Sequence, residues 1–190
     1  MDPDTPLEET MGALEQAVRS GKALYVGLSN YNGETLEKAC AILTEMRVPF
    51  VINQNRYSIF DRTIEGNGLL EATQKLRKGL ITFSPLAQGM LTDRYLNGIP
   101  ADSRIRTDGR FLKESTVEEK LPKIRALNAM AQERGQTLAE MSLAWLLAHP
   151  LVTSVIVGAS SVEQLADNLK ALENISFSQE EQQTIQAILQ

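Results

Sequence analysis

The chain has 190 residues, of which 43% are hydrophobic and 23% charged, and its formal net charge is −5. This composition is typical of a soluble globular protein, and the length fits a single domain over residues 1–190. The negative charge gives no attraction for nucleic acid or an anionic membrane surface, and no apolar run approaches the ~18 residues of a membrane span. Cys40 is the single cysteine, which excludes an internal disulfide or a cysteine-based zinc site and indicates a reducing compartment. The first residues lack the pattern of a secretory signal, so we expect a cytoplasmic protein.

Four short apolar runs predict buried β-strands. The runs are nearly continuous rather than alternating, which is typical of a parallel sheet covered on both faces. They are residues 23–28 (ALYVGL), 50–54 (FVINQ), 79–83 (GLITF) and 154–158 (SVIVG).

Helical patterns fill the intervals between these runs. Apolar residues at helical spacing predict helices that begin near Leu7, Leu36 and Leu69. A polar loop over about residues 92–113 has the composition of a mobile or ligand-covering segment. Five capping boxes predict helix starts at Thr5-Pro6-Leu7-Glu8, Thr116-x-x-Glu119, Thr137-x-x-Glu140, Ser160-x-x-Glu163 and Ser178-x-x-Glu181.

The alternation of strands and helices predicts an α/β protein with a parallel sheet. The first two strand-to-strand steps have the length of a βα unit, roughly 30 residues. Two architectures remain open, a doubly wound sheet and a (β/α) barrel. No G-x-G-x-x-G follows any of the four runs, so the usual dinucleotide fingerprint of the doubly wound fold is absent. A barrel instead binds phosphate at the loops after its last two strands.

Small and amide side chains follow every predicted strand, on the side where parallel α/β sheets bind ligands. Serine and asparagine also serve as turn and N-cap residues, which is the structural alternative at each end. After the last strand, a helix opened by Ser160 would offer backbone N–H groups and the positive end of its dipole to an anion. Gln164 and Asn168 lie one turn apart on one face of that helix. The small residues at 158–160 fit either tight packing or the close approach of a ligand.

Four segments of the chain resemble the second half of the aldo-keto reductase family. The subgroup that they resemble contains the potassium-channel β-subunits and their bacterial glyceraldehyde-phosphate reductase relatives. The resemblance covers nearly the whole chain, and S-P-L-A-x-G with G-A-S-x-x-x-Q-L-x-x-N is a specific combination. The segments are ALYVGLSNY (23–31), FVINQNRYS (50–58), ITFSPLAQGMLTDRYLNGIPADSR (81–104) and VIVGASSVEQLADNL (155–169). The resemblance implies the second half of a TIM barrel, about four βα units, with NADP(H) across its C-terminal face.

The resemblance also implies a role for residues at all four strand ends. Ser29, Asn30 and Gln54 would hold the nicotinamide carboxamide. The pyrophosphate path would be lined by Ser84, Pro85, Leu86, Ala87 and Gln88. The adenosine end would be cradled by Gly158, Ser160, Gln164, Asp167 and Asn168.

Two arginines of the long insert complete the implied site. Arg94 stands where relatives place a basic residue, and Arg104 would reach the adenosine 2′-phosphate. Solvated loop arginines are the simpler interpretation of the same residues. Asp102 departs from the aromatic residue of the channel-type relatives, which weighs against adenine stacking there.

The same resemblance implies that the catalytic residues of the family lie outside this chain. Family members build eight strands from about 250 residues, and this chain resembles the fifth to the eighth. His149, the only histidine, falls at a predicted helix end, and Tyr25, Tyr31 and Tyr57 have no Lys and Asp arranged to lower a phenol pKa. We therefore expect no catalytic residue and no metal ligand in this chain.

The expected function is the NADP(H)-binding portion of an aldo-keto reductase, which reduces a small aldehyde or ketone by hydride transfer from NADPH and is catalytically incomplete alone. Half a barrel leaves two sheet edges exposed, so we expect self-association or pairing with a complementary N-terminal half. A non-catalytic nucleotide-binding or assembly module and a truncated gene product are the alternatives.

Overall fold

The computed structural model describes residue 2 and residues 4–101, 103–107 and 112–190, with the backbone alone described at Arg104 and Thr107. Contacts divide the chain into two compact units. The first unit takes its residues from Met1–Tyr57, Arg62–Phe83 and Pro150–Ile156, and the second takes its residues from Ser58–Asp61, Ser84–His149 and Val157–Gln190. The single domain expected over residues 1–190 stays a prediction.

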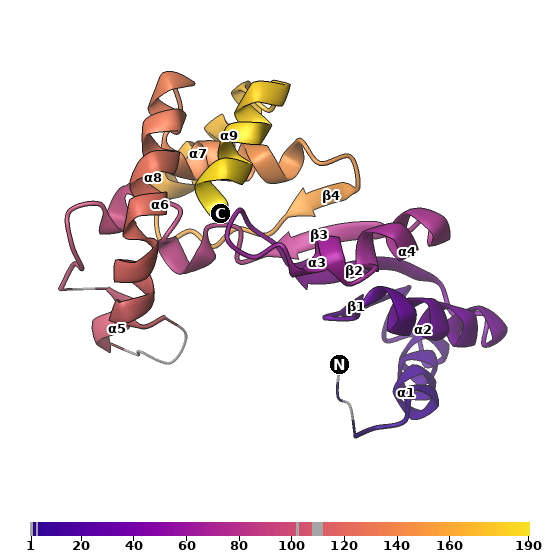
Figure 1. The fold of residues 1–190 in the computed structure, drawn as a ribbon. Helices are drawn as coiled ribbons and strands as arrows, with labels where there is room; N and C mark the ends of the chain where they lie inside the picture. Colours follow the sequence, from indigo (N-terminus) through magenta and orange to yellow (C-terminus); the bar gives the residue numbers. More distant parts are fainter. Residues whose placement is uncertain (1, 3, 102, 108–111) are drawn as a thin grey trace. The chain divides into compact units, whose positions relative to one another are not determined.

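The first unit contains a parallel four-stranded sheet (Figure 1). Its strands are β1 (Val26–Ser29), β2 (Phe50–Arg56), β3 (Gly79–Phe83) and β4 (Val152–Val155), in the spatial order β1-β2-β3-β4. Its helices are α1 (Leu7–Arg19), α2 (Gly33–Glu45), α3 (Thr63–Gly66) and α4 (Leu69–Leu76). Because the spatial order follows the chain order without a reversal, this topology favours the barrel over the doubly wound sheet.

The predicted bounds hold for β3, the predicted start holds for β2, which runs two residues further to Arg56, and the bounds of the two outer strands differ. β2 begins at Phe50 and β3 spans Gly79–Phe83, as predicted. β1 begins three residues after the start of its apolar run, because its neighbour β2 begins at Phe50, the register partner of Val26. The strand predicted over residues 154–158 exists, but its bounds were wrong: β4 begins at Val152 and ends at Val155, the register partner of Thr82.

The prediction that both sheet faces are covered was also wrong. Leu28, Asn53 and Leu80 form one row across the sheet and are all at most 5% exposed. The next row, Ser29, Gln54 and Ile81, is only partly buried. The helices therefore cover one face, as in a barrel wall, and the opposite face stays open in the first unit.

The second unit is mainly helical. Its helices are η1 (Ala87–Gly89), η2 (Asp93–Tyr95), α5 (Arg104–Thr107), α6 (Glu114–Glu133), α7 (Leu138–Leu147), α8 (Val162–Leu169), η3 (Lys170–Glu173) and α9 (Gln179–Leu189). Leu91, Ile124, Leu127 and Ile185 are at most 1% exposed and belong to one apolar core. The insert predicted as a polar loop thus contains η2 and α5 and contributes to that core through Tyr95 and Leu112. No helix in the described ranges is long and apolar enough to cross a membrane.

Two of the predicted capping boxes are confirmed in the second unit. Thr137 caps α7 and Ser178 caps α9, each accepting from the backbone N–H three residues later. In turn, the carboxylates of Glu140 and Glu181 accept a hydrogen bond from the backbone N–H of the cap residue. These two helices therefore begin where the sequence predicts.

Three of the predicted capping boxes were wrong. Thr5 does not cap α1, because its hydroxyl donates to Asp2 Oδ2 at 2.7 Å and Pro6 takes the cap position. Thr116 lies inside α6, which begins two residues earlier. α8 is capped by Ser161 and not by Ser160.

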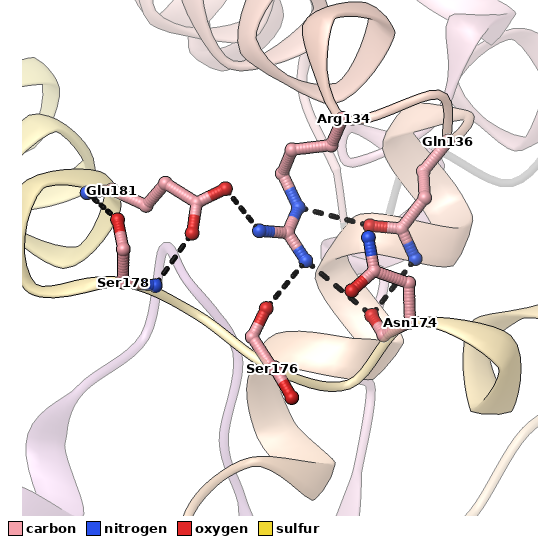
Figure 2. A network of polar contacts seen from close by, with 6 residues as sticks. All are labelled: Arg134, Gln136, Asn174, Ser176, Ser178 and Glu181. Carbon is pink, nitrogen blue, oxygen red and sulfur yellow. Dashed lines mark hydrogen bonds and ion pairs between the residues drawn. The ribbon is translucent and has the colours of Figure 1, made fainter.

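In the second unit, the buried Arg134 links the end of α6 to the loop after η3 and to the first turn of α9 (Figure 2). The Arg134 side chain is 5% exposed and forms an ion pair with Glu181. Its Nε donates to Gln136 Oε1 at 3.0 Å, and its Nη2 donates to the carbonyls of Ser176 at 2.9 Å and Asn174 at 3.3 Å. We call these residues, with Ser178, the Arg134 joint.

Candidate functional site

Three predicted site residues meet at the carboxyl ends of β1 and β2 in the first unit. Ser29 and Gln54 are register partners on the partly open face of the sheet. The Asn30 N–H donates to the Gln54 carbonyl at 3.0 Å. The structure therefore brings together the three residues expected to hold a carboxamide.

Two buried residues of the same region, Asn55 and Tyr57, were missed as parts of the site. Asn55 is 5% exposed, and its Nδ2 donates to the Tyr31 carbonyl at 3.4 Å. This contact supports the turn that contains Asn30, directly after β1. The signal in the sequence was an amide side chain next to the last residue of a buried strand.

Tyr57 is part of a second buried contact at the end of β2. Its hydroxyl donates to Glu65 Oε1 at 2.7 Å, and Arg62 Nε donates to the same oxygen at 2.7 Å. Burial, and then the hydrogen bond and charge of Glu65, raise the pKa of Tyr57 far above its usual value of 10.0. Tyr57 therefore stays protonated with its hydroxyl engaged, which agrees with the expectation that it is not a proton donor to a substrate.

Left-handed backbone collects at the ends of two strands. Arg47 and Arg77 have positive φ angles at the C-terminal ends of α2 and α4, where this conformation is ordinary. In contrast, Asn30 has a φ of 61° directly after β1, and no helix end accounts for it. Non-glycine residues held in this region cost on the order of 1–3 kcal/mol each and cluster at functional sites.

The segment that follows β3 also has left-handed backbone, and this segment belongs to the second unit. Ser84, Ala87 and Gln88 have φ angles of 54°, 47° and 60°. Leu86 and Ala87 pack against the apolar core, and Pro85 is buried. Gln88 is exposed. The predicted pyrophosphate segment is thus a fixed, strained turn rather than a free loop.

The N-terminus of α8 differs from its prediction. The N–H groups expected to be free are partly engaged, since Ser160 donates through both its N–H and its hydroxyl to Gln164 Oε1, at 2.7 and 3.0 Å. The Glu163 carboxylate accepts from its own N–H and from the Ser161 hydroxyl, which lowers its pKa. An anion would have to displace these exposed contacts and would meet the negative charge of Glu163.

The surroundings of Gly158 bear on why the segment before α8 has small residues, which is either tight packing or the close approach of a ligand. A Cβ placed on Gly158 would meet no atom within 4 Å in the described part of the chain. Its φ lies outside the positive range that favours glycine. Packing within this chain therefore does not require glycine at this position.

The remaining predicted residues of the second unit have separate surroundings. Asp167 pairs with Lys170 at 2.7 Å, whereas Asn168 is 9% exposed and its Nδ2 has no hydrogen-bond partner among the described residues. Arg94 lies in η2, and its N–H donates to Thr92 Oγ1 at 3.1 Å. Arg104 opens α5, but its side chain is not described, and Asp102 lies outside the described residues.

A surface hollow of about 350 Å³ lies beside the Arg134 joint and contains none of the predicted site residues. Its arginine already bonds to four groups of the protein, so we assign the joint a structural role. The described residues also contain no group of three His, Cys, Asp or Glu side chains that could hold a metal ion.

The family model of the aldo/keto reductases matches residues 1–190. The chain belongs to the aldo/keto reductase family. It is 49% identical over 185 residues to an L-glyceraldehyde 3-phosphate reductase of Escherichia coli O157:H7. It is 35% identical over 178 residues to a probable voltage-gated potassium channel subunit beta of Oryza sativa subsp. japonica. These matches cover 95% and 92% of this chain.

The fold agrees with the family. A crystal structure of the thermostable aldo-keto reductase Tm1743 with the inhibitor epalrestat matches 98% of this chain with a TM-score of 0.69 and 34% identity. The parallel sheet with alternating helices is therefore part of a TIM-barrel-type fold. The chain spans about half the length of the relatives that it matches, 54% of the reductase and channel-subunit sequences and 56% of the crystallised enzyme.

Proposed function

We propose that this chain is the NADP(H)-binding portion of an aldo-keto reductase that reduces a small aldehyde or ketone. The grouping of Ser29, Asn30 and Gln54 at the carboxyl ends of β1 and β2 carries the proposal, because the three residues expected to hold the carboxamide lie together. The left-handed residues after β1 and β3 support it, since strained backbone is kept where a ligand needs it. We also propose a cytoplasmic location.

In the first unit, the register pair Ser29 and Gln54 and the neighbouring Asn30 have the donors and acceptors that a carboxamide needs. In the second unit, the turn at 84–88 would line a pyrophosphate, and Gly158, Ser160, Gln164, Asp167 and Asn168 would contact adenosine. The Nδ2 of Asn168, which has no hydrogen-bond partner among the residues that the structure describes, fits a role as hydrogen-bond donor to a ligand. Bound NADPH would supply the hydride, while these residues bind and orient it.

The proton for the carbonyl oxygen is assigned to residues outside this chain. Tyr57 is buried and bonded to Glu65, and Tyr31 is buried, which raises its pKa. Neither phenol is therefore suited to donate a proton at neutral pH. Reduction would then require a complementary N-terminal half. The other partner that we consider is a second copy of this chain.

The test is a titration of the purified chain with NADPH and NADH, followed by nicotinamide fluorescence. We expect saturable binding that prefers NADPH. Gly158→Val should weaken NADPH binding about tenfold or more, because branched atoms would fill space that the ligand needs. Gly12→Val is the matched control, since a Cβ at Gly12 also meets no atom within 4 Å in the described residues.

Equal NADPH affinity of Gly158→Val and the wild type would overturn the assignment of this segment. Circular dichroism of both valine variants shows whether a loss of binding reflects a loss of folding. Turnover of 4-nitrobenzaldehyde by the chain alone would contradict catalytic incompleteness. Binding without turnover would agree with the proposal and also with a non-catalytic nucleotide-binding module. Turnover gained on addition of the complementary half would exclude the non-catalytic module.

A further inference from the structure

The turn between β1 and α2 is fixed on its strand side by two hydrogen bonds. It consists of residues 30–32, which we call the β1 turn. The Asn30 N–H donates to the Gln54 carbonyl at 3.0 Å, and the Tyr31 carbonyl accepts from Asn55 Nδ2 at 3.4 Å. A strained residue such as Asn30, with its φ of 61°, persists only where the surrounding structure determines it. These bonds from β2 supply part of that determination.

The helix side of the β1 turn is fixed by the close approach of two glycines. The N–H of Gly33, the first residue of α2, donates to the Asn67 carbonyl at 3.1 Å. A Cβ placed on Gly33 would lie 2.2 Å from the Gly68 carbonyl oxygen. An ordinary C···O contact is about 3.3 Å, so a side chain there would push the two segments apart by about 1 Å. The fold therefore requires glycine at Gly33 for reasons of space.

The atom that a side chain at Gly33 would meet is itself held in place. The Gly68 carbonyl accepts from the Ala72 N–H at 3.1 Å. Next to it, the Leu69 N–H donates to Asn67 Oδ1 at 3.1 Å, and the Leu69 side chain is 0% exposed. Because the start of α4 is tied down in this way, a larger residue would displace the start of α2 and the β1 turn that precedes it.

The two glycines belong to the same unit as the proposed carboxamide site. Ser29, Asn30 and Gln54 also lie in the first unit, whereas the residues proposed for the pyrophosphate and the adenosine lie in the second. A displacement of the β1 turn would therefore act on the nicotinamide end of the ligand. A binding group must be held within about 0.5 Å of its productive place, so a shift of about 1 Å would remove most of its contribution.

We propose that Gly33 is a positioning residue for the nicotinamide end of NADP(H). Its contact with Gly68 keeps the β1 turn, and with it Asn30, in the place where the carboxamide binds. Asn55 supports the same turn from β2 through the Tyr31 carbonyl. The inference rests on the proposed function and adds a selective expectation to it: Gly33 matters for the nicotinamide and not for the rest of the nucleotide.

The test compares two ligands by isothermal titration calorimetry. NADPH contains the nicotinamide, whereas 2′-phospho-ADP-ribose has the same adenosine, 2′-phosphate and pyrophosphate without it. Gly33→Ala should weaken NADPH binding about tenfold or more, because it misplaces Asn30. The affinity of the same variant for 2′-phospho-ADP-ribose should equal that of the wild type.

Gly66→Ala is the matched control, because a Cβ at Gly66 meets no atom within 4 Å in the part of the chain that the structure describes. It should leave both affinities unchanged. Asn55→Leu is a second variant that disturbs the β1 turn from β2. It should weaken NADPH binding alone, about threefold, as expected for the loss of one neutral hydrogen bond. Circular dichroism identifies misfolding, and Asn55→Leu decides the test if Gly33→Ala does not fold.

Amide hydrogen exchange, followed by NMR without nucleotide, reports on the β1 turn itself. The Asn30 N–H should exchange about tenfold or more faster in Gly33→Ala than in the wild type, because its bond to the Gln54 carbonyl is weakened. Gly66→Ala should leave this rate unchanged. Unchanged exchange at Asn30 in Gly33→Ala would overturn the positioning role, whatever the nucleotide result.

The binding outcomes separate this inference from the proposed function. Equal NADPH affinity of Gly33→Ala and the wild type would overturn the inference and leave the proposed function standing. An equal loss of both ligands in folded Gly33→Ala would also overturn it, because the effect would not be selective for the nicotinamide. A wild-type chain that binds no NADPH would refute the proposed function, and the inference with it.

Discussion

The N-termini of α8 and α9 carry the same arrangement of side chains in different surroundings. Each helix is capped by a serine, Ser161 or Ser178, whose hydroxyl accepts from the N–H three residues later. At α9 that third residue is Glu181, which accepts from the Ser178 N–H and pairs with the buried Arg134. At α8 it is Gln164, which is exposed and bonds to Ser160.

The difference shows that one local pattern can build a structural joint or an exposed polar surface. At α9, the carboxylate occupies the helix N-terminus and meets a buried cation, so all partners are within the protein. At α8, the same positions are filled by contacts that solvent or a ligand can replace. Local sequence alone did not separate the two, because the distinction depends on Arg134, 47 residues before Glu181.

The largest expected effect is the loss of the buried cation. Arg134→Met removes four polar contacts and leaves Glu181 without its ion-pair partner. We expect the free energy of unfolding to fall by about 3 kcal/mol, because four oxygen atoms lose a charged donor, each such bond contributing about 1.5–3 kcal/mol before solvent replaces part of it. Urea denaturation followed by the fluorescence of Trp145, the single tryptophan, measures the change.

Arg125→Met is the matched control for this prediction. Arg125 is exposed, and its contact to the Leu96 carbonyl is long, at 3.4 Å. Its replacement should change the free energy of unfolding by no more than about 0.5 kcal/mol. A similar loss in both variants would remove the distinction between the Arg134 joint and an ordinary surface.

Much of the fold could be predicted because the decisive interactions are local or periodic. The apolar runs located β2 and β3, and the capping boxes of α7 and α9 were read correctly from three-residue spacings. The ends of β1 and β4 could not be predicted, because strand pairing ends where the neighbouring strand ends. The open sheet face was missed for a related reason: the apolar runs describe a closed barrel, of which this chain supplies part.

The candidate site could be predicted in part. Ser29, Asn30 and Gln54 were named from the sequence, and the register of β1 and β2 brings them together. Asn55 and Tyr57 were missed as supporting residues, since their partners, Tyr31 and Glu65, come from other segments. The engaged N–H groups of α8 were missed because a capping pattern one residue later competes with the predicted one. The roles of the site residues in binding NADP(H) stay predictions.

The second prediction sharpens the comparison through pH. Burial alone would raise the pKa of Glu181, but the hydrogen bond from the Ser178 N–H and the bond and charge of Arg134 outweigh it and lower the pKa below 4.5. A lowered pKa contributes stability above 4.5 that is lost as the pH falls through the pKa of the folded state. Glu181→Gln should therefore lose less stability than the wild type between pH 5 and 3, which thermal unfolding across that range measures.

Glu163→Gln is the corresponding variant at α8. Its pKa is also lowered, by bonds from its own N–H and from the Ser161 hydroxyl, but the side chain is exposed. Exposed contacts are screened by solvent, so this variant should follow the wild-type pH dependence more closely than Glu181→Gln does. The reverse order would show that α8, and not α9, has the more strongly coupled N-terminus.

The smallest expected effect is at Gln164. Gln164→Ala removes the two exposed contacts to Ser160 but keeps the Ser161 cap, so the free energy of unfolding should change by no more than about 0.5 kcal/mol. Glu181→Ala, the same position of α9, should cost more, because it leaves the buried Arg134 without a counter-ion. Urea denaturation of both variants gives the ranking. If Gln164→Ala proves as costly as Glu181→Ala, the polar contacts at α8 are a structural joint, and their assignment to an exchangeable ligand surface would have to be withdrawn.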